Sequence, residues 1–384
     1  MIQHKIFNTT EALPKDWDIL ATNDLFLEKE YLTALEEASP KNIHLYFIAV
    51  YNDDTLVGVA VVQLVKLFLN DMFRQQHQGN FKEFIRRSVA SFIKGCVLVV
   101  GNIMHTGQHG VYFDERRISS SDFLSEINKA LIALKPRVRK DYNRSVQAIV
   151  LKDYFENDII EQSTACIKTE NFHRLKLQPN MLLNVSDDWH NIDDYKADLA
   201  KKYRDRYKRA RKKRGALKPV ELSLETIKKH SKELYQLYLN VSDNAEFNTF
   251  LLQENHFYSL KRHLKDNFKV FGYYDQGKLV GFFSLLLNHD NLETYFLGYD
   301  EIHQYPNQLY LNMLYDMLDF GIQNKFKTIV YARTAMAIKS SVGAKAVDMV
   351  VYMKHTNIFL NDLFKLIFRI VNPKQDWEER HPFK

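Results

Sequence analysis

The sequence predicts an α/β (α+β) fold with two tandem domains, each built on a central mixed sheet flanked by helices. Three observations predict this fold class. The chain has 384 residues, which is long for a single core and suits two domains. With 46% hydrophobic and 26% charged residues, and only 13 Gly and 8 Pro, its composition is that of a folded globular protein. A sequence pattern typical of strand, turn and strand also occurs twice.

The repeated phrase spans residues 47–59 and returns at residues 270–282. Each copy has two apolar runs around a polar turn, which is typical of a β-hairpin. The identical positions in the two copies are Tyr51 and Tyr274, Leu56 and Leu279, Val57 and Val280, and Gly58 and Gly281.

The segments after the two hairpins follow one order of strand, helix, strand, short helix and strand. After the first hairpin we expect a strand at 96–100, a helix at 120–134, a strand at 146–151 and a closing strand at 175–185. After the second we expect a strand at 292–297, a helix at 308–323, a strand at 328–331, a short helix through Ile338 and a strand at 347–353. The sequence therefore predicts one supersecondary unit used twice.

We place the first domain at residues 1–188 and the second at 189–384. The first carries an insertion, 64–94, in which apolar residues alternate with Arg, Lys and Gln as in amphipathic helices. This insertion is either a packed lid or a lipid-contacting surface. The C-terminal segment 356–371 is predicted as an amphipathic helix whose apolar face is too wide for a solvated helix. That face must bury against the domain, a partner or a bilayer surface.

Positive charge is concentrated in a predicted basic helix at residues 191–214. From Lys196 to Arg214, eleven Lys and Arg against two Asp give a local charge of +9, whereas the whole chain carries +6. A stripe recurring every four residues is predicted to pack inward, and consists of Tyr195, Leu199, Tyr203 and Tyr207. A solvated face is one interpretation of the charges. The other is an anionic partner: the phosphates of a nucleotide-containing cofactor, tRNA or anionic lipid headgroups. DNA is not predicted, because no sequence-reading motif accompanies the helix.

The compartment is predicted from the cysteines and the N-terminus. Cys96 and Cys166 have neither metal-ligand spacing nor the number needed for a disulfide framework, which favours a reducing compartment. The first ten residues are polar, so no signal peptide is predicted. No uninterrupted apolar run of about 18 residues occurs. We expect a cytoplasmic protein, with peripheral contact at the inner face of the membrane as an extension of that prediction.

Four segments taken in order resemble the Fem-like branch of the GNAT acyltransferase superfamily: residues 201–211, 234–240, 276–281 and 338–343. The resemblance covers most of residues 190–355. It implies two tandem GNAT-like lobes that transfer an acyl or aminoacyl group from an activated donor to an amine. Some relatives use acyl-CoA or acyl-carrier thioesters, and Fem proteins use aminoacyl-tRNA to extend peptidoglycan precursors.

One departure from the acetyltransferase pattern concerns the donor's phosphates. The phosphate loop expected after strand 292–297 is absent, and residues 298–308 read Gly-Tyr-Asp-Glu-Ile-His-Gln-Tyr-Pro-Asn-Gln instead. The usual mode of CoA binding is therefore not predicted for this lobe. The matching segment 101–110 of the first lobe has three glycines, and Gly lets backbone N–H groups approach a ligand closely. The cofactor-binding candidates are Gly101, Asn102, Thr106, Gly107 and His109 here, with Arg333 and Lys339 after strand 328–331. An ordinary long turn is the alternative for 101–110.

Transfer of an acyl group to an amine needs a proton acceptor, an oxyanion donor and an acid for the leaving group. Asp300 and His303 lie just beyond strand 292–297 and are the candidate bases, with Glu246 as a second carboxylate. Tyr305 is a candidate acid. The substrate-binding candidates are Tyr207, Arg211 and Tyr310. For each of these residues alone, a capping, surface or packing role is the ordinary alternative.

The sequence thus leads to three functional hypotheses. The first is an N-acyltransferase that moves an acyl group from a CoA or carrier-protein thioester to an amine, lipidic or related to the cell envelope. The second is a Fem-like transferase that carries an amino acid from tRNA to a peptidoglycan precursor. The third is a non-catalytic GNAT-like binding module. No permanently bound cofactor or metal is expected; acyl-CoA or an acyl-carrier thioester is the expected cosubstrate, and an acyl carrier protein and a small-molecule or lipid amine are the expected partners.

Overall fold

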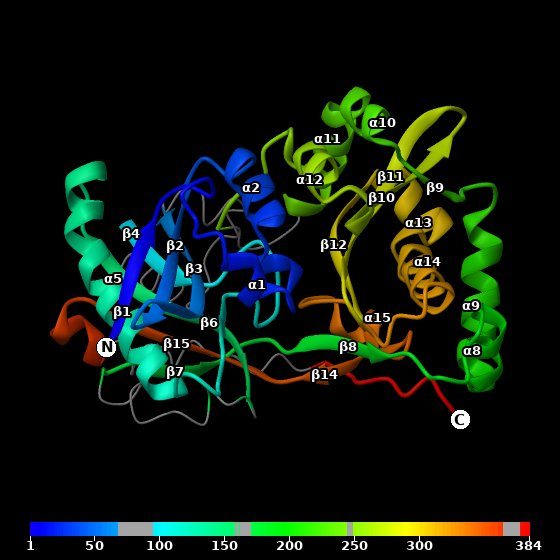
Figure 1. Cartoon of the computed structure of the whole chain (residues 1–384). Helices are drawn as coiled ribbons and strands as arrows, with labels where there is room; N and C mark the ends of the chain where they lie inside the picture. The colour runs from blue at the N-terminus through cyan, green and yellow to red at the C-terminus, as the bar shows by residue number, and fades with distance from the viewer. Residues whose placement is uncertain (68–94, 157, 159–160, 162–169, 244–248, 364–376) are drawn as a thin grey trace. The chain divides into compact units, whose positions relative to one another are not determined.

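The computed structural model describes residues 1–67, 95–156, 158, 161, 170–243, 249–363 and 377–384 (Figure 1). The chain divides into two compact units. Unit 1 consists of Met1–Gln178, Glu246–Leu251 and Asp348–Lys374. Unit 2 consists of Pro179–Ala245, Leu252–Val347 and Gln375–Lys384. Each unit therefore draws on both halves of the sequence.

Unit 1 is built on a mixed sheet with one long helix packed against it. Its strands, in spatial order, are β1 (Ile2–Phe7), β2 (Ile43–Asn52), β3 (Thr55–Leu67), β4 (Gly95–Val100), β6 (Val146–Phe155), β15 (Met349–His355) and β7 (His173–Lys176), and β5 (Val111–Phe113) pairs with β3. The helices are α1 (Trp17–Ala21), η1 (Leu25–Leu27), α2 (Lys29–Glu37) and α5 (Ser120–Tyr142). Apolar residues of α5 such as Phe123, Ile127 and Leu131 join the sheet in one buried core.

Unit 2 repeats this plan with more helices. Its strands, in spatial order, are β9 (Pro219–Glu221), β10 (Phe268–Asp275), β11 (Lys278–Asn288), β12 (Asn291–Tyr299), β13 (Thr328–Val330), β8 (Asn180–Asn184) and β14 (Lys345–Val347). The helices are α8 (Ile192–Asp198), α9 (Lys201–Arg214), α10 (Leu224–Lys229), α11 (Ser231–Ser242), α12 (His256–Leu264), η2 (Lys265–Asn267), α13 (Glu301–Asn307), α14 (Leu309–Gln323) and α15 (Met336–Ser340).

The predicted repeat is confirmed strand by strand. In both units a hairpin, β2–β3 or β10–β11, shifts register at the same point, where Tyr51 faces Leu56 and Tyr274 faces Leu279. A third strand then pairs antiparallel with the hairpin. The fourth strand, which follows a long helix, pairs parallel with the third. The fold class predicted from the sequence, two mixed sheets each flanked by helices, is therefore correct.

The closing strands of the two units are exchanged, which the sequence did not predict. The expected strand 175–185 is two strands, since β7 stays in unit 1 whereas β8 pairs with β13 and β14 in unit 2. The expected strand 347–353 likewise divides between β14 in unit 2 and β15, which pairs with β6 and β7 in unit 1. The compact units therefore do not follow the predicted boundary between residues 188 and 189.

A physical reason explains this difference. Pro179, which separates β7 from β8, has no N–H group to donate to a ladder and breaks the strand. The apolar residues on either side are equally suited to a buried strand, and Leu183 is buried in unit 2 just as Val350 is in unit 1. Hydrophobic alternation identifies a strand but does not say which sheet accepts it.

The predicted basic helix 191–214 is two helices, α8 and α9. The chain is extended at Leu199 and Ala200, where Leu199 forms a β-bridge with Phe383 and the Ala200 N–H donates to the Pro382 carbonyl at 2.8 Å. The C-terminal residues therefore interrupt the helix. The outer limits of the predicted range 191–214 are confirmed, since Asn191 caps α8 and α9 ends at Arg214, just before Gly215. The inward stripe is also confirmed, since all of its members are buried: Tyr195, Leu199, Tyr203 and Tyr207.

Two predicted amphipathic segments fall largely outside the described residues. Of the insertion 64–94, residues 64–67 belong to β3 and 68–94 are not described. Of the helix 356–371, residues 358–363 are helical, and Ile358 and Phe359 are 67% and 81% exposed. Among the helices that the structure describes, none is long and apolar enough to cross a membrane.

We predict that a fragment of residues 1–188 does not fold on its own, because it lacks β15 and the buried side chains of Val350 and Tyr352. Joining residue 178 through an Asn-Gly turn to residues 348–356 should restore a folded unit, because β7 and β15 are antiparallel neighbours that a two-residue turn can connect. Circular dichroism and limited proteolysis of the two fragments check this. Cooperative unfolding of fragment 1–188 alone would contradict it.

Candidate functional site

The central strand of unit 2, β12, is open along half of one edge. It pairs with β13 only at Asn291, Leu292 and Glu293, and no strand in the described part of the chain pairs with it on that side beyond Glu293. Residues 294–297 are half-buried. In unit 1, by contrast, β4 pairs with β6 from Cys96 to Val100 and all five of these residues are buried. An unpaired edge in the middle of a sheet leaves backbone N–H and C=O groups for other partners.

A β-bulge falls on the same residues of β12. Thr294 faces Leu285 and Leu297 faces Phe283, so two residues of β12 stand opposite Ser284 alone. The Ser284 hydroxyl donates to the Phe296 carbonyl at 2.6 Å and fixes the bulge. Bulges turn the backbone locally and are frequent beside active sites. In unit 1 the β3–β4 pairing runs without a shift from Val62 to Leu67.

Helix α11 covers one face of this strand closely. A Cβ atom on Gly298 would lie 2.4 Å from the Leu237 carbonyl carbon, so only Gly allows this approach. The Asn240 amide donates to the Tyr299 carbonyl at 3.2 Å. These contacts hold the end of β12 in a fixed position beside its open edge.

Two of the predicted catalytic residues lie together where β12 ends. Asp300 caps α13, since its carboxylate accepts the Ile302 N–H at 3.0 Å. The Nδ1 atom of His303 is 3.8 Å from this carboxylate, and Nε2 is 3.2 Å from Asp275 at the β10–β11 turn. The histidine therefore sits between two carboxylates, on the side of β12 away from β13. Tyr305 is 81% exposed on α13. Glu246 lies outside the described residues.

Tyr310 occupies the first turn of α14 and is half-buried. Its ring centroid is 6.4 Å from that of Tyr299, the last residue of β12. Burial raises the pKa of Tyr310 well above its usual value of 10, so the phenol remains a proton donor at neutral pH. Its backbone N–H donates to the Gln304 side chain at 2.8 Å. That amide of the α14 N-terminus is therefore already satisfied.

Lys339 is buried on α15 behind the loop that follows β13. Its amine donates to the Arg333 carbonyl at 2.6 Å and to the Ala332 carbonyl at 3.3 Å. Burial lowers the pKa of Lys339 to about 7. Ala332, Thr334 and Ala335 all have positive φ, a strained backbone for residues other than Gly. Lys339, a predicted cofactor-binding residue, thus holds this loop, in which Arg333 is half-buried.

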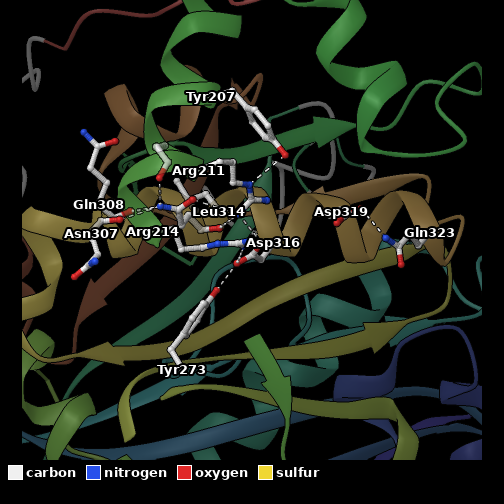
Figure 2. Close-up of polar contacts among 12 residues, drawn as sticks. Tyr207, Arg211, Arg214, Tyr273, Asn307, Gln308, Leu314, Asp316, Asp319 and Gln323 are labelled. Atoms are coloured by element: carbon white, nitrogen blue, oxygen red, sulfur yellow. Dashed lines mark hydrogen bonds and ion pairs between the residues drawn. The ribbon is translucent and has the colours of Figure 1, made fainter. Parts of the chain in front are cut away.

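The predicted substrate-binding residues Tyr207 and Arg211 belong to an anchor around Asp316 (Figure 2). Asp316 accepts hydrogen bonds from Arg211 at 2.6 Å, Arg214 at 3.0 Å and Tyr273 at 2.6 Å. Arg211 also donates to the Tyr207 hydroxyl at 3.1 Å. Burial by itself lowers the pKa of Arg211, but the charge of Asp316, the Tyr207 phenol and the hydrogen bonds to both together raise this pKa above its usual value. This network fixes α9 to α14 and β10.

A different face of α9 lines an open groove that the sequence did not single out. The groove has a volume of about 360 Å³ and is lined by Lys202, Tyr203, Arg206, Arg209, Gln308 and Leu311. The three cations stand at positions i, i+4 and i+7 of α9, so they share one helix face. The i, i+4, i+7 spacing of these cations is the sequence signal that could have identified the groove. It does not stand out in the sequence, because nearly every position of α9 outside the tyrosine stripe is charged.

The glycine-rich segment 101–110 of unit 1 is packed tightly. Asn102 is buried, where its amide donates to the Tyr31 hydroxyl at 3.0 Å and its carbonyl accepts from Gln63 at 2.8 Å. A Cβ atom on Gly110 would lie 2.5 Å from the Gly101 Cα atom, so the two ends of the segment touch.

The remaining candidates of this segment are close together as well. His109 Nδ1 lies 2.8 Å from an Asp24 carboxylate oxygen, and the Gly107 N–H donates to Asp153 at 3.3 Å. A Cβ atom on Gly107 would lie 2.4 Å from His109 Nε2. Thr106 is half-buried beside them. The structure thus brings the five candidates together, with glycines where backbone and side chains approach most closely.

We predict that Asp316→Ala destabilises the protein by roughly 3 kcal/mol, because it leaves two partly buried guanidinium groups and a buried phenol without their acceptor. Asp319→Ala is the matched control on the same helix. Among the described residues, Asp319 accepts a side-chain hydrogen bond only from Gln323 of its own helix, and we expect a loss below about 1 kcal/mol. Urea denaturation compares the two. Equal losses of unfolding free energy in the two variants would contradict a stabilising role of the Asp316 hydrogen bonds.

The Lys339 amine predicts a pH dependence of stability. Its pKa in the folded protein, about 7, lies below the ordinary 10.5, so between these values the unfolded chain binds more protons. The free energy of unfolding of the wild type should therefore rise with pH relative to Lys339→Met, by roughly 3 kcal/mol from pH 6.5 to 9.5. Chemical denaturation at several pH values measures it. A wild-type-to-variant difference that stays constant with pH would refute the expectation.

Comparisons with known proteins give structural matches. No protein-family model and no curated protein sequence matches the chain. The structure of FemX matches with a TM-score of 0.53 at 12% identity, covering 95% of this chain and 100% of that one. A tandem GNAT protein from clavulanic acid biosynthesis matches with 0.52 at 11% identity, covering 93% and 99%. The C-terminal domain of a protein assigned as a lysylphosphatidylglycerol synthetase from Agrobacterium fabrum matches with 0.51 at 8% identity, covering 92% and 94%. The chain has the fold of the Fem-like and tandem GNAT proteins, as the resemblance in its sequence implied.

Proposed function

We propose that the chain is a transferase that moves an acyl or aminoacyl group from an activated donor to an amine, and that unit 2 holds the reacting carbonyl. The observation that carries this proposal is the coincidence of an open strand edge and a β-bulge on residues 294–297 of β12. In the matching strand β4 of unit 1, the pairing with β3 has no register shift, and the pairing with β6 continues to Val100 after one shift between Cys96 and Val97. The fold shared with FemX and the tandem GNAT protein supports the same reaction class.

The groups around β12 supply what the reaction needs. The amine nitrogen attacks the donor carbonyl, and backbone N–H groups of β12, at the edge that β13 leaves beyond Glu293, are the proposed donors to the oxyanion that develops. His303, with Asp275 and Asp300 beside it, remains the candidate acceptor of the ammonium proton, and it lies where β12 ends rather than at the edge that faces β13. Tyr310 is the candidate donor to the leaving group. A C–N bond forms, the bond to the thiol or ribose oxygen breaks, and the leaving group takes a proton.

The first candidate donor is an acyl thioester of CoA or of an acyl carrier protein. The tandem GNAT neighbour, whose structure here is the form without acetyl-CoA, supports a CoA thioester as the donor. The candidate acceptor is an amine, small or lipidic. Exposed Ile358 and Phe359 at the start of the C-terminal helix favour contact with a lipid surface, where a lipidic amine would be reached.

A second candidate is transfer of an amino acid from tRNA to a peptidoglycan precursor. One observation favours it: eleven Lys and Arg against two Asp between Lys196 and Arg214 form a surface suited to an RNA backbone. Co-purification of tRNA at low salt, lost as salt rises, would distinguish this donor from a thioester.

The experiment for the first candidate mixes the purified protein with acyl-CoA of several chain lengths and with amine-containing lipids, and measures released thiol. Amine-dependent thiol release supports the proposal. If neither thioesters nor aminoacyl-tRNA are consumed with any amine, the non-catalytic binding module becomes the better account.

We predict that Tyr310→Phe lowers kcat by roughly 10²-fold, because it removes a protonated donor beside β12. Tyr305→Phe is the matched control, since this exposed phenol lies nearby on α13 and should leave kcat within about twofold. Steady-state kinetics with saturating donor measures both. A larger loss for Tyr305→Phe than for Tyr310→Phe would reverse the assignment of the two tyrosines.

A further inference from the structure

Within the residues that the structure describes, the cations of the α9 groove form no ion pair. Arg206 is half-buried, and within the described residues its guanidinium makes neither an ion pair nor a side-chain hydrogen bond. Burial lowers its pKa, and the charges of Arg380 and Arg209 lower it further. Lys202 and Arg209 likewise have no ion pair in the described part of the chain. A cluster of like charges beside a half-buried arginine costs free energy unless an anion from outside neutralises it.

A different set of basic residues attaches α9 to the rest of unit 2. Arg211 and Arg214 already anchor α9 through Asp316. Arg206, Lys202 and Arg209 take no part in that anchor. The packing of α9 therefore does not explain why these three cations line the groove.

A buried hydroxyl lies on α14, the helix that also contributes Leu311 to the groove. Tyr315 is fully buried, and its hydroxyl has no hydrogen-bond partner among the described residues. It lies on α14 seven residues after the groove residue Gln308, about two helical turns along the same face. Its ring packs against Tyr207, with the ring centroids 4.7 Å apart, and Arg211 lies 5.6 Å from the ring centroid. Burial raises the pKa of Tyr315 to about 12, and the charges of Arg206 and Arg211 oppose that rise.

One backbone amide at the start of α14 already has a partner. Helix α13 occupies the segment after β12, and the Tyr310 N–H in the first turn of α14 is bonded to Gln304. The charged donors that line the groove are the side chains of Lys202, Arg206 and Arg209.

We propose that Lys202, Arg206 and Arg209 bind adjacent phosphates of a small nucleotide-type donor, a role that rests on the transferase function proposed for unit 2. The three side chains are spread over about 10 Å of helix axis, enough for two or three phosphates. Their combined charge matches a diphosphate. Tyr203 and Leu311 line the groove with them, so it presents a bounded site rather than a continuous track for a polymer.

The test compares two double variants with the same charge change. Lys202→Glu with Arg209→Glu alters two exposed cations of the groove, whereas Lys208→Glu with Lys212→Glu alters two exposed cations on another face of α9. The probes are inorganic pyrophosphate and coenzyme A, with a short single-stranded RNA as the other source of phosphates. Calorimetry at low salt measures their dissociation constants. Because all four residues are exposed, both variants should fold.

The proposal expects pyrophosphate or coenzyme A to bind the wild type, and the groove variant to bind it roughly 10- to 100-fold more weakly while the control changes less than about threefold. Binding of pyrophosphate alone would indicate free phosphate rather than a nucleotide as the source. No binding of either small probe, equal losses in both variants, or binding of RNA alone would overturn it. Arg206→Gln is a second groove variant with the same expected direction.

The outcomes separate this inference from the proposed function. If phosphates bind in the groove but no acyl or aminoacyl transfer occurs, the proposed function fails and the groove stands as a phosphate site. If transfer occurs and the groove variant leaves the donor KM unchanged, the proposed function stands and the phosphate assignment fails.

Discussion

The carboxylate of Asp316 is the interaction on which the arrangement of unit 2 depends. It accepts hydrogen bonds from Arg211 and Arg214 of α9 and from Tyr273 of β10 (Figure 2). One buried carboxylate on α14 therefore links α14 to both α9 and the sheet. Because α9 is fixed by these two arginines, its rotation about its own axis is also fixed. The face with Lys202, Arg206 and Arg209 is then directed to the groove beside α14. The same charges on a freely rotating helix would define no site.

The two sheets show how one plan can support two different roles. In unit 1 the third and fourth strands remain paired to the end of β4, and the segment that follows is packed against Tyr31, Gln63 and Asp153. In unit 2 the corresponding strands part after Glu293 and a bulge interrupts β12. The two sheets therefore differ at the same place in the shared plan, where β4 stays paired with β6 and β12 is no longer paired with β13.

Much of this fold was predictable, because the patterns that define its elements lie within short stretches of the sequence. The hairpins around Tyr51 and Tyr274, the long helices α5 and α14 and the cap at Asn191 follow from patterns within a few residues of each other. The exchange of β8 and β15 was not predictable, because a strand's apolar alternation is the same whichever sheet receives it. The break at Leu199 was missed because its cause, Phe383, is far away in the sequence.

The site was predictable only in part. Asp300 and His303 were placed correctly beyond the central strand, because the end of a strand can be located from its sequence. The sequence does not show which face of α9 contacts Asp316, because that contact joins residues about a hundred positions apart. It therefore could not distinguish Arg211, which pairs with Asp316, from Arg206, which lines the groove. The structure of the protein with its acyl donor bound tests the account most directly. The account predicts the reacting carbonyl within hydrogen-bonding distance of backbone N–H groups of residues 294–297, and a donor seated instead on residues 101–110 of unit 1 would contradict it.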